Sequence, residues 1–289
     1  MEILTEPFSY AFFARGVAAS AIAGGLCALL GVFIILRGMA YIGHGLSHAI
    51  FGGAVVSYVA EINFYIGAGL WGFISGLLIH AVTKKRQIGA DAAIGIVTTA
   101  SFAIGVAVIS RVRKFTKNFE AALFGNILGV TPQDLLVLAG VAGVTVVAVF
   151  FLYKQLLFVT FDPEVASTYG VNAGWVDVAF TMLLTASIIA SMQVLGVTMI
   201  AAAIVIPAVT ARLLTNRFAT LLWLSTAIGT ACGLVGMYAS YYLDISSGAT
   251  IVLVATLAFL VALVVSRVST LANHSVHPAP AGNVGALFD

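Results

Sequence analysis

Charge is the scarcest property of this sequence. Its 289 residues include 13 Lys and Arg and 11 Asp and Glu, so 8% of the chain is charged, whereas about 25% is usual in soluble domains. Hydrophobic residues make up 61%. This composition excludes a soluble domain of any size. The formal net charge of +2 says little about partners, because in a membrane protein the placement of Lys and Arg matters more than their sum; no nucleic-acid partner is expected.

Cysteine is also rare, and the N-terminus lacks the charges of a leader. Cys27 and Cys232 both fall in apolar segments, which argues against a structural disulfide and favours two small core residues. The first ten residues contain Glu2 and Glu6 but neither Lys nor Arg. A cleavable signal peptide needs a basic start, so none is predicted.

Long apolar runs, by contrast, recur from end to end. A helix needs about 20 residues to cross a bilayer, and the candidate segments are 12–36, 41–60, 64–83, 91–110, 133–157, 176–195, 197–214, 219–243 and 248–267. None alternates with the two-residue period of barrel strands, and lipid offers no partner for free backbone groups, so all are expected to be helical. The sequence predicts an all-α polytopic membrane protein with eight to nine transmembrane helices, the stretch 176–214 being broken only around Gly196.

These segments form one expected transmembrane domain, residues 1–268. A disordered cytoplasmic tail is expected over 269–289, which contains Pro278 and Pro280 and little apolar content before Ala286.

The orientation is predicted from the basic residues, which accumulate on the cytoplasmic side. With the N-terminus outside and the C-terminus inside, the inner loops hold Arg37, Lys84, Lys85, Arg86, Lys154, Arg212, Arg217 and Arg267, and the outer loops hold Arg15, Arg111, Arg113, Lys114 and Lys117. The cluster 111–117 opposes this assignment. Its amphipathic continuation, 119–128, is expected to lie along the membrane surface.

Local signals mark a helix start and two helix contacts. Residues 131–134 contain Thr, Pro and Asp in the order of an N-cap, a first helical position and an acidic first turn. Small residues spaced by four, Gly72 with Gly76 and Gly229 with Gly233, predict close approaches between transmembrane helices.

Titratable residues at membrane depth are few, and each is a candidate functional residue because burial in lipid is costly. Arg15 and His80 lie near segment ends, where their side chains can reach the interface. Asp91 and Asp177 each open a segment, and helix capping is the preferred interpretation for both.

His44 and His48 differ from the other candidates. Four residues apart, they share one helix face, and two neutral imidazoles can bind one transition-metal ion. The alternative is a pair of buried histidines satisfied by carbonyls and Ser47, and spacing alone leaves both open. A zinc-protease helix needs His-Glu-x-x-His, but residue 45 is glycine, and the chain has no P-loop for ATP.

The stretch 37–53 around these histidines resembles a signature of the permease subunits of metal-importing ABC transporters. Further matching stretches follow in the family's order: 91–96, 123–128 with 131–134, 162–170, 193–197, 206–212 and 247–252. The resemblance covers roughly residues 11–267.

The resemblance implies a transport subunit, not an enzyme, in a bacterial plasma membrane. It implies a separate ABC ATPase that hydrolyses ATP, an extracytoplasmic metal-binding protein, and a second permease copy, expected to be identical. The cargo would be manganese, zinc or iron, with no permanently bound cofactor.

The stretch 162–170 resembles the cytoplasmic loop that docks on the ATPase, which assigns coupling to Asp162, Glu164, Ala166, Tyr169 and Gly170. It also has the pattern of a short helix, with Asp162 as N-cap, Pro163 at the first position and Gly170 at the end.

One departure from the family concerns His44, where the family usually has Asp. The resemblance therefore supports His48 as a metal ligand more strongly than His44. Replacing a carboxylate with an imidazole would shift preference away from manganese and toward zinc or iron. Gln193 resembles the family's polar residue in a later span and is a third expected ligand.

Two other classes compete with the importer. A gradient-driven secondary transporter or channel would suit the helix breaks at Gly196 and Pro207. An intramembrane metalloenzyme lacks a general base beside the two histidines.

Overall fold

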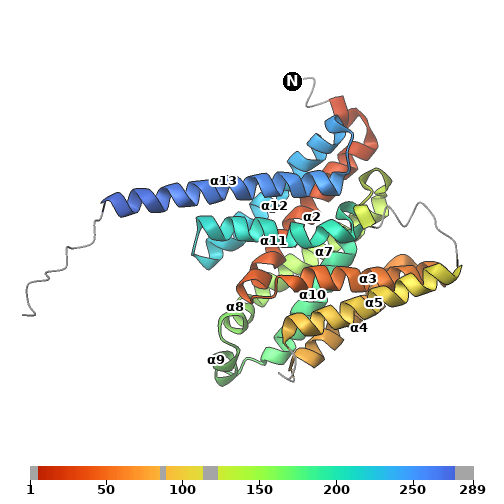
Figure 1. Ribbon diagram of the computed structural model, residues 1–289, viewed down its shortest axis with the longest axis horizontal. Coiled ribbons are helices and arrows are strands. Elements are labelled where there is room, and N and C mark those ends of the chain that lie inside the picture. The colour runs from red at the N-terminus through yellow and green to blue at the C-terminus, as the bar shows by residue number, and fades with distance from the viewer. Residues whose placement is uncertain (1–5, 85–88, 113–122, 277–289) are drawn as a thin grey trace, which may run out of the picture.

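The computed structural model describes residues 6–84, 89–112 and 123–276, and every regular element in these ranges is helical (Figure 1). The elements are η1 (Glu6–Ser9), α2 (Ala11–Leu36), α3 (Tyr41–Val59), α4 (Phe64–Lys84), α5 (Ala90–Val112), η2 (Ile127–Gly129), α7 (Pro132–Phe151), α8 (Tyr153–Phe161), α9 (Pro163–Thr168), α10 (Ala173–Leu195), α11 (Val197–Leu214), α12 (Phe218–Leu243) and α13 (Ser247–Val276). The predicted all-helical class is confirmed.

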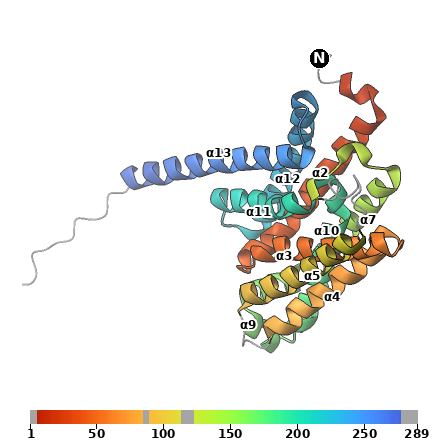
Figure 2. The same ribbon diagram turned by 45° about the vertical axis from the view of Figure 1, so that its right-hand side comes forward.

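Eight of these helices are long and apolar enough to cross a membrane: α2, α4, α5, α7, α10, α11, α12 and α13. The remaining predicted segment, 41–60, forms α3 but is not among the eight, since its glycines, serines and histidines dilute its apolar content. It nevertheless packs against α4, α5 and α11. Figures 1 and 2 show α3, α4 and α5 running side by side.

One predicted segment, 133–157, is not a single helix. It divides into α7 and α8 at Leu152, whose backbone leaves the helical region at φ −90° and ψ 8°. The break directs α8 toward α9 and the start of α10.

Helix α2 forms the centre of the core and packs against α7, α10, α11 and α12. Its contact with α12 depends on glycine: a Cβ on Gly24 would lie 2.3 Å from the carbonyl oxygen of Gly229. A Cβ on Gly233 would lie 2.2 Å from the carbonyl oxygen of Ser20. The predicted role of the 229–233 pair in close helix packing is confirmed.

The other predicted pair joins α4 to two neighbours. A Cβ on Gly72 would lie 2.6 Å from Ile50 Cγ1 on α3, and one on Gly76 would lie 2.8 Å from Thr181 Cγ2 on α10. These glycines allow α4 to pack closely against α3 and α10.

The predicted break at Gly196 separates α10 from α11. Its backbone has φ 76° and ψ 154°, a conformation that is strained for every residue except glycine. The segment 123–126 crosses this break: Asn126 N–H donates to the Gln193 carbonyl at 3.0 Å, and Thr198 Oγ1 donates to the Leu123 carbonyl at 2.8 Å. The break is therefore a packed junction.

The predicted helix start at residues 131–134 is also confirmed. Thr131 Oγ1 accepts from Asp134 N–H at 3.2 Å, and Asp134 Oδ2 accepts from Thr131 N–H at 2.9 Å, which completes a capping box. Tyr65 on α4 donates its hydroxyl proton to the other oxygen of Asp134, which ties α4 to the start of α7.

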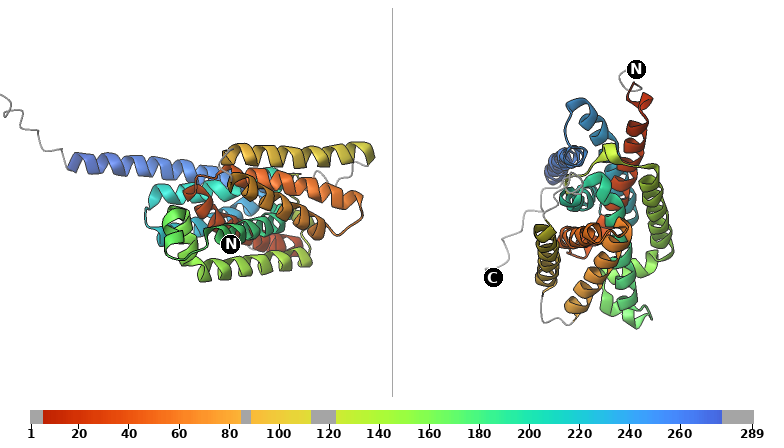
Figure 3. Two further views of the ribbon diagram at one scale, coloured as in Figure 1. Left: turned by 90° about the horizontal axis from the view of Figure 1, so that it is seen from below. Right: turned by 90° about the vertical axis from the view of Figure 1, so that its right-hand side faces the viewer.

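The last helix is longer than predicted. Helix α13 continues to Val276, so residues 269–276, expected to begin a disordered tail, are helical; Pro278 is the first proline or glycine after Gly248 and nothing earlier breaks the helix. Figure 1 and the left panel of Figure 3 show α13 extending beyond the bundle. Residues 277–289, and Arg113, Lys114 and Lys117 of the basic cluster, lie outside the described residues.

We predict that Gly196→Ala lowers the stability of the detergent-solubilised protein by about 1–3 kcal/mol, the cost of this backbone conformation without glycine. The new Cβ would also lie 2.4 Å from the Gly125 nitrogen. Thermal unfolding measures the effect. Gly140→Ala on α7 is the matched control, because a Cβ there meets no atom within 4 Å, and it should be neutral or stabilising. Equal midpoints for the two variants would contradict the prediction.

Candidate functional site

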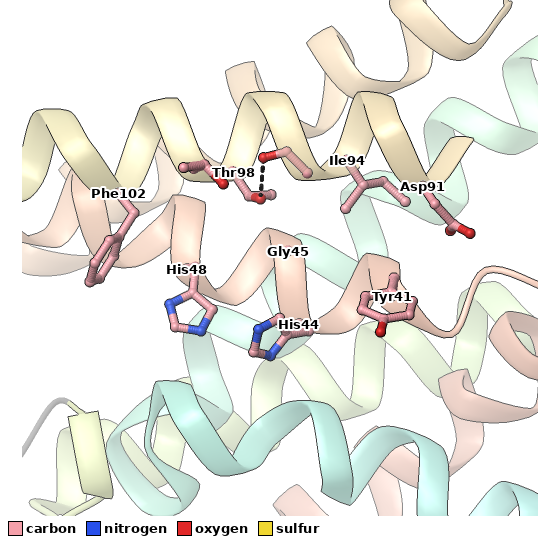
Figure 4. A pocket seen from close by; sticks show the side chains of 10 residues that line it. Tyr41, His44, Gly45, His48, Asp91, Ile94, Thr98 and Phe102 are labelled. Atoms are coloured by element: carbon pink, nitrogen blue, oxygen red, sulfur yellow. Dashed lines mark hydrogen bonds between the residues drawn. The ribbon is translucent and has the colours of Figure 1, made fainter. Parts of the chain in front are cut away.

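His44 and His48 project from one face of α3, as their spacing predicts (Figure 4). Their ring centroids lie 4.5 Å apart with an angle of 67° between the planes. His44 is exposed and His48 is half-buried, and Phe102 of α5 packs edge-on against His48 with a centroid distance of 5.4 Å. The two imidazoles are thus adjacent at the surface of a single helix.

The pair lines a cleft of about 430 Å³ between α3 and α5. Glycines bring the two helices together: a Cβ on Gly45 would lie 2.4 Å from Ile94 Cγ2, and one on Gly52 would lie 2.2 Å from the Ser101 carbonyl oxygen. Asp91, at the first turn of α5, also lines this cleft. The cleft therefore combines two imidazoles with one carboxylate along its length.

Ser47 does not serve the histidine rings. Its hydroxyl lies 2.8 Å from the His44 carbonyl and 3.2 Å from the Val197 carbonyl, so it donates to the backbone of α3 and of α11. This contradicts the alternative interpretation, in which the Ser47 hydroxyl would have bonded to the rings of two buried histidines. His44 is in any case exposed.

The described residues form no group of three or more His, Cys, Asp and Glu side chains close enough to hold a metal ion together. The chain alone thus offers two imidazoles at one point, with Asp91 further along the cleft (Figure 4). Asp91 does lie in the first turn of α5, and its predicted role as a helix cap stays a prediction; its place in the cleft follows only from the packing of α5 against α3.

Gln193 is not brought to this cleft. It is half-buried near the end of α10, and its backbone carbonyl accepts from Asn126 N–H. The residues lining the cleft do not include it, so its expected role as a third ligand stays a prediction.

Asp177 is not a helix cap, contrary to our interpretation. The N-cap of α10 is Asn172, whose side chain accepts from Trp175 N–H at 3.1 Å. Asp177 lies a turn further on and forms an ion pair with Arg37, with Nη1 and Oδ1 2.8 Å apart. Burial lowers the pKa of Arg37, and the Asp177 carboxylate counters that effect.

The remaining candidates take local roles. Arg15 Nε donates to the Ala11 carbonyl within α2 at 3.2 Å. His80 is half-buried and, with Arg37 and Asp177, lines a second cavity of about 120 Å³. This cavity has no residue in common with the His44 cleft except Ile94.

The stretch 162–170 folds as predicted. Helix α9 begins at Pro163, and Asp162 Oδ1 accepts from Glu164 N–H at 3.1 Å and from Val165 N–H at 2.9 Å. Ala166 is fully buried, whereas Tyr169 is 76% exposed, and Gly170 ends the segment with φ +77°. The short helix presents an exposed side while Ala166 packs against the bundle.

Comparison with known proteins identifies the class. The ABC 3 transport family matches residues 9–266. The chain is 36% identical to the "Manganese transport system membrane protein MntC" of Halalkalibacterium halodurans over 88% of this chain and 87% of that protein. It is 34% identical to a "Probable iron transport system membrane protein" of Haemophilus influenzae over 92% of this chain and 94% of that protein.

A solved structure agrees. "PsaBC from Streptococcus pneumoniae in complex with Fab" superposes with a TM-score of 0.82 at 30% identity, covering 90% of this chain and 94% of that one. The fold and the matches define a multi-pass membrane permease. The chain belongs to the ABC 3 transport family, and its resemblance to the permease subunits of metal-importing ABC transporters is confirmed.

Proposed function

We propose that this chain is the transmembrane subunit of an ATP-driven importer for divalent transition-metal ions, with manganese, zinc and iron as the candidate cargo. The observation that carries the proposal is the His44–His48 pair on α3, facing a cleft closed on one side by α5. Relatives named for manganese and for iron transport support this class of cargo.

Two ligands suit a site through which an ion passes. A structural metal site usually has four protein ligands, whereas a transported ion must also leave. His44 is exposed, so a second, identical permease copy could cover the cleft and add its own side chains. The function is passage and gating, without covalent chemistry.

A separate ATPase would supply the energy by docking on α9. Of the residues assigned to coupling, Asp162, Glu164, Tyr169 and Gly170 are exposed and would meet the ATPase, while the buried Ala166 would anchor the helix to the bundle. An extracytoplasmic metal-binding protein would deliver the ion. Docking requires α9 to be cytoplasmic, which agrees with the predicted N-out, C-in orientation. Arg37 of the predicted inner set contacts Thr160 and Asp177 on either side of α9, so the basic α2–α3 turn lies at the same end of the bundle as α9.

His48→Ala should abolish metal uptake by the complete importer in lipid vesicles while leaving assembly intact, because His48 is half of the imidazole pair. Radioactive manganese uptake with ATP inside the vesicles measures the effect. Trp223→Ala, which removes an exposed ring on α12 outside both cavities, is the control and should retain uptake. Normal uptake by His48→Ala would remove His48 from the mechanism, and wild-type uptake driven by an ion gradient without ATP would favour a secondary transporter.

His44→Asp should shift the preference of the importer toward manganese relative to zinc, because a carboxylate is a harder ligand than an imidazole. Competition between the two metals in the uptake assay gives the ratio directly. An unchanged ratio would show that His44 does not discriminate between metals.

Glu164→Arg should weaken docking of the ATPase on α9, because it reverses a charge on the exposed side of the helix. Co-purification of the two subunits measures docking. Glu61→Arg changes an exposed acid in the loop between α3 and α4, at the opposite end of α3, and should leave docking unchanged. Full docking by Glu164→Arg would place the ATPase contact elsewhere.

A further inference from the structure

Arg37 is an arginine held inside the bundle by three different groups. Its Nη1 donates to Asp177 Oδ1 at 2.8 Å and its Nε donates to Thr160 Oγ1 at 3.1 Å. The guanidinium carbon lies 4.6 Å from the centroid of the Phe180 ring, and 8% of the side chain is exposed. A charge buried to this degree is retained only where its partners are well placed.

The two polar partners of Arg37 flank α9. Thr160 lies near the end of α8, two residues before the N-cap Asp162, and Asp177 lies near the start of α10, which follows α9. Helix α9 is therefore joined at both ends to the segments that hold Arg37.

The backbone of Arg37 connects directly to α3. Arg37 is the C-cap of α2, and its N–H donates to the Phe33 carbonyl at 3.0 Å. Met39 N–H returns to the Ile34 carbonyl at 3.0 Å, and Ile42 N–H donates to the Met39 carbonyl at 2.9 Å. This hydrogen-bonded turn leads into the first turn of α3, which carries His44.

We propose that Arg37 is a positioning residue that transmits movement of α9 to the histidine-bearing helix α3. The inference rests on the proposed function, since it assumes an ATPase at α9 and metal at the His44–His48 pair. Through Thr160 and Asp177, Arg37 makes the start of α3 follow α9, so that nucleotide-driven displacement of α9 moves the cleft and its two histidines relative to the rest of the bundle.

The chemistry of arginine suits this task. Its planar group presents donors in fixed directions, so one side chain can hold the Thr160 hydroxyl and the Asp177 carboxylate together. Its third nitrogen, Nη2, is buried without a hydrogen-bond partner, and Arg37 borders the cavity of about 120 Å³. The guanidinium thus has both a spare donor and adjacent space, which permits a second arrangement of the same partners.

The test uses the permease assembled with its ATPase and binding protein in vesicles, and measures metal ions imported per ATP hydrolysed. Arg37→Gln should lower this ratio about tenfold, a usual size for coupling between sites, while ATP hydrolysis and assembly persist. Arg37→Lys, which keeps the charge but lacks the rigid planar group that fixes the directions of the donors, should lower it less. Arg212→Gln, an exposed arginine at the end of α11, is the control and should leave the ratio unchanged.

Two further variants separate transmission from simple stability. Thr160→Val and Asp177→Asn each remove one partner and leave Arg37 in place, and each should reduce the ratio; combining either with Arg37→Gln should add no further loss. A normal ratio in Arg37→Gln, or in both partner variants if Arg37→Gln does not assemble, would overturn the proposal. Absence of ATP-dependent uptake by the wild-type complex would instead overturn the proposed function.

Discussion

The close contact between α2 and α12 is the constraint on which the rest of the bundle depends. Lipid tails are as apolar as the side chains of the helices, so the hydrophobic effect contributes little to helix association in a membrane. Transmembrane helices therefore associate through close packing and hydrogen bonds. Gly24 and Gly229 bring the two backbones together, and Ser225 Oγ adds a hydrogen bond of 2.7 Å to the Ala28 carbonyl. With α12 fixed on α2, the positions of α11 and α13 follow, because both pack against α12.

The helices and their ends could be predicted because they depend on local chemistry. Apolar runs set the spans, Thr131 and Asp162 set two helix starts, and Gly196 set a break. The errors have equally local causes. The end of α7 at Leu152 could not be predicted, because the segment 133–157 is apolar throughout and a change in backbone direction does not alter hydropathy. Helix α13 continues past residue 268 because the polar residues that follow are compatible with a helix.

The candidate site divides in the same way. The shared face of His44 and His48 follows from their spacing. The place of Asp91 in the cleft and the ion pair of Asp177 instead depend on contacts between helices far apart in the sequence. Asp177 lies 140 residues from Arg37, so no local pattern connects them. By sequence alone, a carboxylate such as Asp177 near the start of a helix is interpreted as a cap, because only the packing of the helices shows that its partner is Arg37.

Glycine contacts also determine which parts can move separately. Gly105 on α5 meets Gly52 on α3 with only 2.8 Å between the added Cβ and the Gly52 Cα, and Gly72 on α4 meets Ile50 on α3. Helices so closely interlocked cannot slide past one another without separating, which leaves α3, α4 and α5 to move as a group. Arg37, in the α2–α3 turn, provides a polar connection from this group to the segments that flank α9. A displacement there would change the position of both histidines together and preserve their 4.5 Å spacing.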